Sequence, residues 1–196
     1  VRPVLKENPK WTATVVEPVP FLFDLLQRNY LAMKDRVEAL RFAVAARNGP
    51  CRMMAANASG NYKQVSTLVV DEGHGSRCFT AGRPCHWVRS MINRGQLSPV
   101  EVTCVTLETL VQKRRDPAVP IDVLVIDAEM LDYTLLRVAN LRAPSLRPLA
   151  IEFESKTMTL QQGHELAAKR AVQGYLCRFA PGGELQWPGR KWWVHY

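Results

Sequence analysis

Acidic side chains follow two β-favouring segments of the sequence. Glu17 comes directly after residues 12–16, and Asp127 and Glu129 follow the apolar run 121–126. Ligands of open α/β sheets bind beyond the carboxyl ends of the strands. A carboxylate at such a position can accept two hydrogen bonds from a ribose diol, so Glu17 is a candidate nucleotide contact. Asp127 and Glu129 lie at the mouth of a largely apolar strand, where charge is costly unless it is used or paired. The alternative is that Glu17 is a solvated loop residue, which is the commoner role of an acid at a strand end.

A third group of acids lies further along the chain. Glu152 and Glu154 share one face of the expected strand 149–153, Glu154 leaves its carboxyl end, and Asp132 lies shortly after the apolar run. Acids converging on one sheet edge suit a cation, a cofactor amine or a substrate hydroxyl group. Pairing with nearby arginines is an equally good interpretation. Those arginines are Arg137, Arg142 and Arg147.

Basic residues dominate the middle of a chain whose formal net charge is +8. Between Glu38 and Glu101 the only acids are Asp71 and Glu72. This balance favours an anionic partner, either RNA or an acidic lipid surface, although a solvated basic face explains it equally well. The candidate contacts are Arg77, Arg83, Arg89 and Arg94.

The cysteines and histidines predict neither a disulfide framework nor a metal site. The 5 cysteines are odd in number and widely spaced, which favours a reducing compartment. The one spacing that suits zinc lacks a Cys-x-x-Cys pair, so we expect no metal. It consists of His74, Cys78, Cys85 and His86. No apolar run approaches the roughly 18 residues of a membrane-spanning helix.

Strand and helix patterns alternate along the chain, which predicts an open α/β sheet with crossover connections in a single domain of residues 1–196. Residues 47–99 break the alternation and are expected to be an inserted hairpin with long loops. The apolar run 121–126 is typical of a parallel strand buried on both faces. The other expected strands are 12–16, 38–45, 64–70, 100–106, 149–153, 175–179 and 191–196, and the expected helices are 20–33, 107–115, 132–138 and 159–173.

Several of these segments, taken in order, resemble FkbM-like methyltransferases. The similar stretches are Val15-Val16-Glu17-Pro18-Val19-Pro20 with the helix after it, residues 38–46, 105–110, 121–129 and 147–154, and Gly174-Tyr175. The resemblance implies a Rossmann-like sheet that transfers a methyl group from S-adenosylmethionine, commonly to a hydroxyl group. It also implies that Glu17 binds the cofactor ribose, that Asp127 and Glu129 line the pocket, and that Glu154 lies near it.

The sequence departs from this family at three points. Val125 stands where the family usually has lysine, and Met130 stands where it has glycine. The strand and glycine turn that hold the cofactor should lie about 20 residues before the ribose-binding acid. Only 16 residues precede Glu17, and the first glycine of the chain is Gly49. We therefore expect a methyltransferase sheet without its first strand and glycine loop.

These departures favour a catalytically silent subunit of a larger protein assembly, docked through the basic segment and the aromatic residues 187–196. The alternatives are an active methyltransferase whose cofactor-binding segment is missing from the sequence given, and an RNA-contacting protein. The chain starts at Val1, so either a leader was removed or an N-terminal part was left out. An intracellular location is expected, with import into a mitochondrion or plastid as one origin of the processed start.

Overall fold

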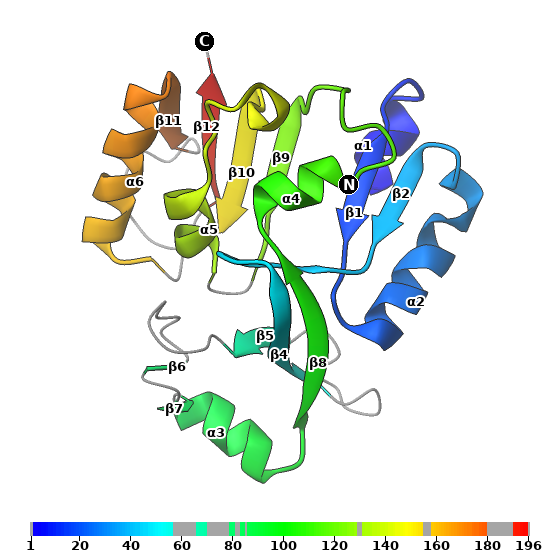
Figure 1. The fold of residues 1–196 in the computed structure, drawn as a ribbon, viewed down its shortest axis with the longest axis vertical. Coiled ribbons are helices and arrows are strands. Elements are labelled where there is room, and N and C mark those ends of the chain that lie inside the picture. The colour runs from blue at the N-terminus through cyan, green and yellow to red at the C-terminus, as the bar shows by residue number, and fades with distance from the viewer. Residues whose placement is uncertain are drawn as a thin grey trace.

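The computed structural model describes residues 2–56, 66–69, 79–80, 83–84, 86–128, 131–154, 158–179 and 190–195. These residues form the mixed α/β fold that the alternation predicts. Figure 1 shows a layer of strands flanked by helices, with a smaller sheet extending from one end of that layer.

The main layer consists of two groups of strands. All of its described strands run in the same direction except the last one of the chain (Figure 1). In the first group β1 (Ala13–Val16) pairs in parallel with β2 (Val37–Leu40). In the second, β9 (Val123–Ile126) pairs in parallel with β10 (Ala150–Glu154). The closing strand β12 (Arg190–His195) lies antiparallel between β10 and β11 (Tyr175–Phe179). No strand pairing joins β1 to β9 within the described residues.

The helices begin where the sequence signals place them. Pro20 opens α2 (Pro20–Tyr30), which the 3₁₀ helix η1 (Leu31–Met33) extends. Thr106 caps α4 (Leu107–Gln112), and Thr159 forms a capping box at α6 (Leu160–Val172). The remaining helices are α1 (Arg2–Glu7), which the sequence did not predict, α5 (Asp132–Val138) and the 3₁₀ helix η2 (Pro144–Leu146).

A second sheet, here called the arm, extends from the carboxyl ends of the main strands (Figure 1). Its centre is the antiparallel pair β4 (Gly49–Ala56) and β8 (Leu97–Val105), flanked by β5 (Ser66–Val69) and β3 (Ala43–Val44). Helix α3 (His86–Asn93) precedes β8, where the sequence predicted loops. Two short strands, β6 (Phe79–Thr80) and β7 (Arg83–Pro84), pair with each other.

One expected strand is divided between the two sheets. Residues 38–45 read as a single strand, but β2 ends at Leu40 and β3 begins at Ala43. The first part pairs with β1 and the second with β8 of the arm. Apolar residues occur on both sides of the break, so the hydrophobic pattern alone does not reveal that the partner changes.

Glu38 links the two groups of main strands through its side chain. Its Oε2 accepts the backbone N–H of Arg115 at 2.8 Å and the hydroxyl of Thr14 at 3.3 Å. Arg115 belongs to the connection that leads to β9, and its guanidinium also donates to the carbonyl of Asp35 at 3.4 Å. The strand group β1–β2 is thus tied to the chain that enters β9 without any pairing between β1 and β9.

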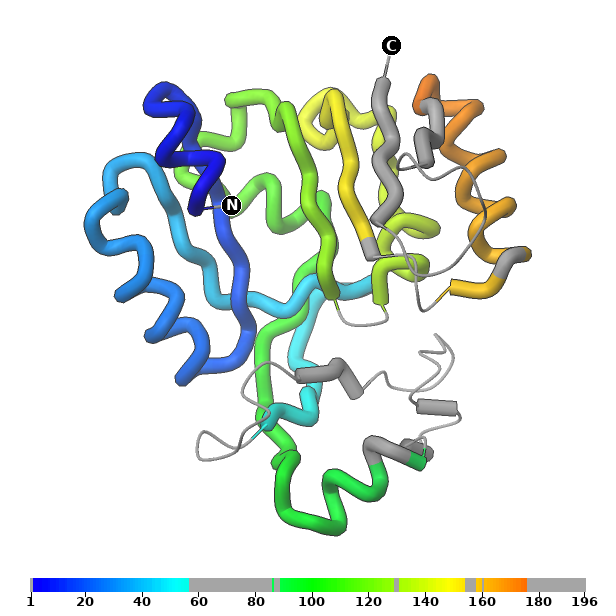
Figure 2. The backbone as a smooth tube through the Cα atoms, turned by 180° about the vertical axis from the view of Figure 1, so that it is seen from behind, coloured from blue at the N-terminus to red at the C-terminus, as the bar shows by residue number. Residues whose placement is uncertain are grey.

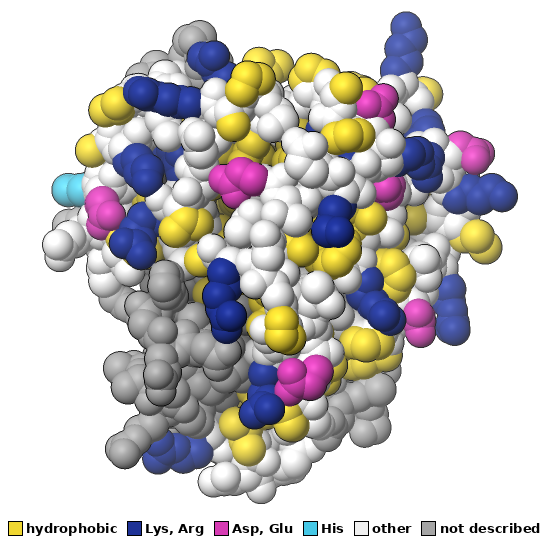
Figure 3. Space-filling model, viewed as in Figure 1, with side chains coloured by type: hydrophobic (Ala, Val, Ile, Leu, Met, Phe, Trp, Pro, Cys, Tyr) yellow, Lys and Arg dark blue, Asp and Glu magenta, His cyan; other side chains and the backbone are white. Residues whose placement is uncertain are grey.

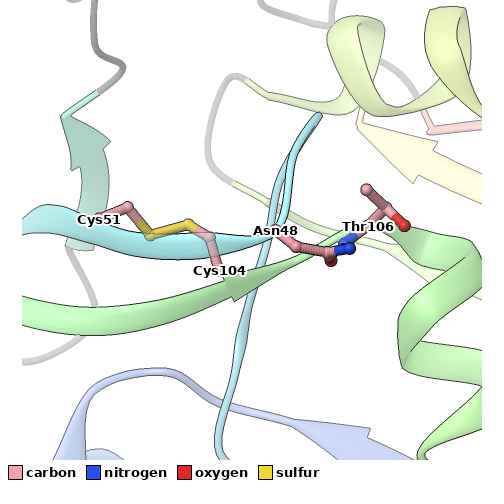
Figure 4. The surroundings of a disulfide bond; sticks show 4 residues. All are labelled: Asn48, Cys51, Cys104 and Thr106. Atoms are coloured by element: carbon pink, nitrogen blue, oxygen red, sulfur yellow. A yellow bond between two sulfur atoms is a disulfide. The ribbon is translucent and has the colours of Figure 1, made fainter.

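A disulfide joins the two long strands of the arm close to the main layer. Cys51 on β4 and Cys104 on β8 are bonded, with their Cα atoms 5.9 Å apart, and both are buried (Figure 4). The two cysteines are 53 residues apart, so the sequence gives no local sign of the pair. Because disulfides persist in oxidising compartments, this bond runs against the expectation of a reducing one.

Removing the disulfide is expected to destabilise the fold. A cross-link that closes a loop of this length lowers the conformational entropy of the unfolded chain. In the chain-entropy account this raises the free energy of unfolding by about 4 kcal/mol. The double variant Cys51→Ala/Cys104→Ala should therefore unfold at lower urea concentration, by up to that free energy. Reductant should destabilise the wild type and leave the variant unchanged. Recovery of both cysteines as alkylated thiols from unreduced native protein would contradict the pairing.

The Glu38 link is expected to matter more than an exposed ion pair. Glu38→Ala leaves the N–H of Arg115 without its acceptor and should cost about 1–2 kcal/mol of unfolding free energy. The matched control is Glu101→Ala, which removes the exposed pair formed by Arg52 Nε and Glu101 Oε1 at 2.8 Å. That loss should stay below about 1 kcal/mol. Equal effects of the two variants in urea denaturation would contradict the role of Glu38.

Candidate functional site at the carboxyl edge

Two of the acids predicted as site residues lie at the same end of the main layer. Glu17 follows β1 and Asp127 follows β9, and both strands end at the edge that faces the arm, here called the carboxyl edge. The chain from β2 to β4 crosses this edge in both backbone views (Figures 1 and 2). The carboxyl edge is therefore bounded by β1, β9 and the base of the arm.

The carboxylate of Glu17 is fixed in place by the start of α2. Its Oε1 accepts the backbone N–H of Val19, the N-cap residue of that helix, at 2.8 Å. The backbone N–H of Glu17 donates to the carbonyl of Leu40 on the neighbouring strand at 3.2 Å. Strand pairing thus fixes the backbone and the helix start fixes the side chain, so the orientation of this carboxylate is set before any ligand arrives.

Burial changes the ionisation of Glu17. It raises the pKa of this carboxyl above its ordinary value, and the hydrogen bond from Val19 opposes the rise. The ionised form is therefore short of solvation and gains from a ligand that brings further hydrogen-bond donors. A vicinal diol is such a ligand, because both of its hydroxyl groups donate to the same carboxylate.

Asp127 is exposed, and the backbone N–H of the next residue, Ala128, donates a hydrogen bond to a buried acid. Asp132, in the first turn of α5, is fully buried, and its Oδ2 accepts the backbone N–H of Ala128 at 3.3 Å. The sequence predicted Asp132 as part of a substrate pocket. Its burial suits a group that positions the turn carrying Asp127.

The other predicted acids are only partly described. Glu152 is buried on β10 in register with Val125 of β9 and Trp192 of β12. Glu154 ends β10, as expected, and its side chain lies outside the described part of the chain. Glu129 and Met130 also lie outside it.

The strand β9 is not buried on both faces, which corrects the prediction from its apolar sequence. Val123 and Val125 are 38% and 48% exposed, whereas Ile126 is buried. Val123 and Val125 point to the same face of β9, because side chains alternate along a strand, and the described residues leave that face partly uncovered. In addition, β9 pairs only with β10 in the described sheet, so its other backbone edge is open. Open edges present backbone N–H and C=O groups that another strand can pair with.

Asn48 is a structural residue of the edge that the sequence search did not select. Its Oδ1 accepts the backbone N–H of Thr106, the N-cap of α4, at 2.9 Å beside the disulfide (Figure 4). Gly49 follows with a φ of 123°, a conformation that favours glycine. The Asn-Gly pair is a turn signal and would have been the clue to this connection.

The predicted basic contacts are spread along the arm. Arg89 on α3 and Arg94 just after it are exposed. Arg83 lies on β7 with its side chain outside the described part, and Arg77 lies wholly outside it. The structure thus places two of the four cations on helix α3 and just after its end.

Neither a metal cluster nor a membrane-spanning helix occurs among the residues that the structure describes. No group of three His, Cys, Asp or Glu residues there could hold a metal ion. Of the four residues with zinc-like spacing, only His86 at the start of α3 is described, and His74, Cys78 and Cys85 lie outside. No described helix has the length and apolarity needed to cross a bilayer.

Because the pKa of Glu17 is raised, the variant Glu17→Gln is expected to gain folding stability over the wild type at high pH. The folded state holds its proton more tightly than the unfolded state, so wild-type stability falls as the pH rises from about 4.5 through the folded pKa. The amide still accepts the N–H of Val19 and carries no charge. The variant should therefore be more stable than wild type at pH 8 and equal to it below pH 4.5 in urea denaturation. Asp24→Asn, an exposed acid on α2, controls for the lost charge, and an equal gain there would contradict the burial argument.

Comparison with known proteins gives one match. The sequence model of a family described as "Methyltransferase FkbM domain" matches residues 3–175, which is most of the chain. Neither the curated proteins nor the solved structures include a match to this sequence.

Proposed function

Because the chain belongs to the FkbM methyltransferase family, we propose that it binds S-adenosylmethionine at the carboxyl edge and transfers the methyl group to a hydroxyl group of its substrate. The observation that carries the proposal is Glu17, a partly buried carboxylate held by Val19 at the end of a parallel strand. A carboxylate that is short of solvation and fixed in direction at the end of a parallel strand suits a ligand-binding role.

Glu17 is the residue that would hold the cofactor ribose. The start of α2 carries a partial positive charge, which favours the ionised form that a diol needs. With Oε1 engaged by Val19, the rest of the carboxylate can accept the ribose hydroxyl groups. Binding would restore the hydrogen bonds that the carboxylate lost on burial, so the donor set of the ligand fits this residue.

Asp127 would line the other side of the site. It is exposed at the end of β9, on a turn positioned by Asp132. Both β1 and β9 have an open edge in the described sheets, so a further strand can pair between them. In this family, such a strand carries the glycine turn that binds the cofactor. Under this proposal the strand belongs to a part of the protein beyond the sequence described here.

S-adenosylmethionine supplies an electrophilic methyl group on a sulfonium centre. The residues of the chain contribute mainly by position: Glu17 and Asp127 hold the cofactor from two sides, with Glu129 as a further candidate, and Glu154 is the candidate that orients the acceptor hydroxyl for in-line attack. In that step the hydroxyl oxygen bonds to the methyl carbon, the bond between that carbon and sulfur breaks, and the hydroxyl proton passes to water. The acceptor belongs to the class of hydroxyl compounds on which members of this family commonly act.

A catalytically silent subunit of a larger assembly is the second candidate. Val125 favours it, because this apolar side chain is 48% exposed on β9 at the position where the family usually has lysine. A subunit that no longer handles the cofactor could keep the fold and replace this lysine with a residue that packs against a partner.

Cofactor binding separates the two candidates. The native polypeptide, with its mass and N-terminal sequence determined first, should bind S-adenosylmethionine and S-adenosylhomocysteine in isothermal titration calorimetry. Glu17→Ala removes a charged hydrogen-bond partner and should weaken binding roughly tenfold to hundredfold. Affinity should also fall as the pH is lowered through the Glu17 pKa, because protonation removes an acceptor.

The matched control is Glu7→Ala, an exposed acid on α1 away from the carboxyl edge, which should leave affinity unchanged. Absence of binding by folded native protein would overturn the enzyme proposal and favour the silent subunit. Equal losses in the Glu17 and Glu7 variants would overturn the role of Glu17 while leaving cofactor binding intact.

A further inference from the structure

The end of the main layer opposite to the site carries half of the large apolar side chains that are exposed among the described residues, including the three most exposed. We call this end the amino edge. It consists of the segments that lead into β1, β2, β9, β10 and β11, residues 10–12, 31–36, 113–122, 139–149 and 172–174. Leu31, Leu149 and Val172 are 69%, 57% and 72% exposed, and Trp11 and Val119 are also exposed.

Cations outnumber carboxylates along the same edge. Lys10, Lys34, Arg115 and Arg142 are exposed there, whereas the carboxylates of these segments are Asp35, Asp116 and Asp122. Figure 3 shows hydrophobic and basic side chains interspersed along the upper rim of the molecule, with few acidic ones. The other cations of these segments are Arg36, Lys113, Arg114 and Arg147, and the exposed Lys169 lies in the last turn of α6.

Hydrogen bonds hold the amino edge as one surface. Arg36 donates to four carbonyl groups between Leu5 and Trp11, and Arg115 connects to the β2 side through Glu38 and Asp35. At the other side Arg142 donates to the carbonyl of Val172 at 2.7 Å, joining the end of α6 to the segment before β10. The segments therefore present their exposed side chains in a fixed arrangement.

We propose that the amino edge binds the surface of a bilayer that contains acidic lipids. Exposed aliphatic side chains enter the headgroup region, and the surrounding lysines and arginines pair with lipid phosphates, the combination that holds proteins at such surfaces. RNA offers phosphates as well, and Trp11 is one aromatic plane on which a base can stack. The most exposed apolar side chains of the edge are nevertheless the aliphatic Leu31, Leu149 and Val172, which do not stack on bases and suit the headgroup region of a bilayer.

The arrangement leaves the carboxyl edge facing away from the membrane. Parallel strands put Glu17 and Asp127 at one end of the layer and the segments of the amino edge at the other. A domain docked in this way would keep both its site and the arm open to the aqueous phase. This inference does not depend on the proposed methyl transfer, since it uses a different surface and a different ligand.

Vesicle co-sedimentation of the native polypeptide tests the proposal. Binding is expected to phosphatidylcholine vesicles that contain phosphatidylserine, to be absent with phosphatidylcholine alone, and to weaken as salt screens the charges. The triple variant Leu31→Ser/Leu149→Ser/Val172→Ser should bind at least about tenfold more weakly. Lys10→Glu/Lys34→Glu should show a comparable loss.

Two matched variants keep the test specific. Leu25→Ser changes an exposed leucine on α2 outside the amino edge, and Arg41→Glu reverses an exposed cation between β2 and β3 at the carboxyl edge. Both should bind vesicles like the wild type, and circular dichroism melting should show that all variants are folded. Equal losses in test and control variants, binding to neutral vesicles alone, or no vesicle binding would each overturn the proposal. Binding of single-stranded RNA by the wild type, without binding of vesicles, and loss of that RNA binding in Lys10→Glu/Lys34→Glu would assign the edge to nucleic acid instead.

Discussion

The structure depends on one constraint. The strands β1 and β9 point in the same direction, but they do not pair with each other within the described sheet. Their relative position is set by the carboxylate of Glu38, which accepts from the backbone of Arg115, and by β3, which leaves the β1–β2 side and pairs with β8. The Cys51–Cys104 disulfide then fixes β8 to β4 beside that junction. Together with the apolar core that contains both Val19 and Ile126, these contacts determine how far Glu17 lies from Asp127, which is the geometry that a nucleotide spanning the two would require.

This organisation places the two proposed binding surfaces, the carboxyl edge and the amino edge, at opposite ends of the main layer. Parallel strands direct Glu17 and Asp127 to the carboxyl edge, where the arm also begins, and the crossover helices return to the amino edge. Apolar and basic side chains are exposed at the amino edge, whereas the acids proposed to bind a ligand lie at the opposite end. The buried core around Leu135, Ile151 and Leu166 lies between the two proposed surfaces.

Local signals in the sequence predicted most of the elements, because each has a strong local cause. Helix α5 matches its predicted bounds, and the capping box of Thr159 marks the start of α6. The family resemblance was confirmed over residues 3–175. Two local elements, the helices α1 and α3, were also missed. The other misses depend on contacts between distant residues: the transfer of the chain from β2 to β3, the disulfide across 53 residues, and the exposure of Val123 and Val125. An apolar strand reads as buried whether or not a neighbour covers it. The roles of the site acids remain predictions, since a carboxylate reveals its partner only when one is bound.

The central claim is that one ligand bridges the two strand groups. Amide hydrogen exchange of the native polypeptide with and without S-adenosylhomocysteine measures this directly. Protection is predicted at the amides of residues 17–19 and, in the same complex, of residues 127–128, with the exchange of α3 in the arm unchanged. Protection confined to one strand group, or no change in either, would contradict a cofactor site shared between Glu17 and Asp127.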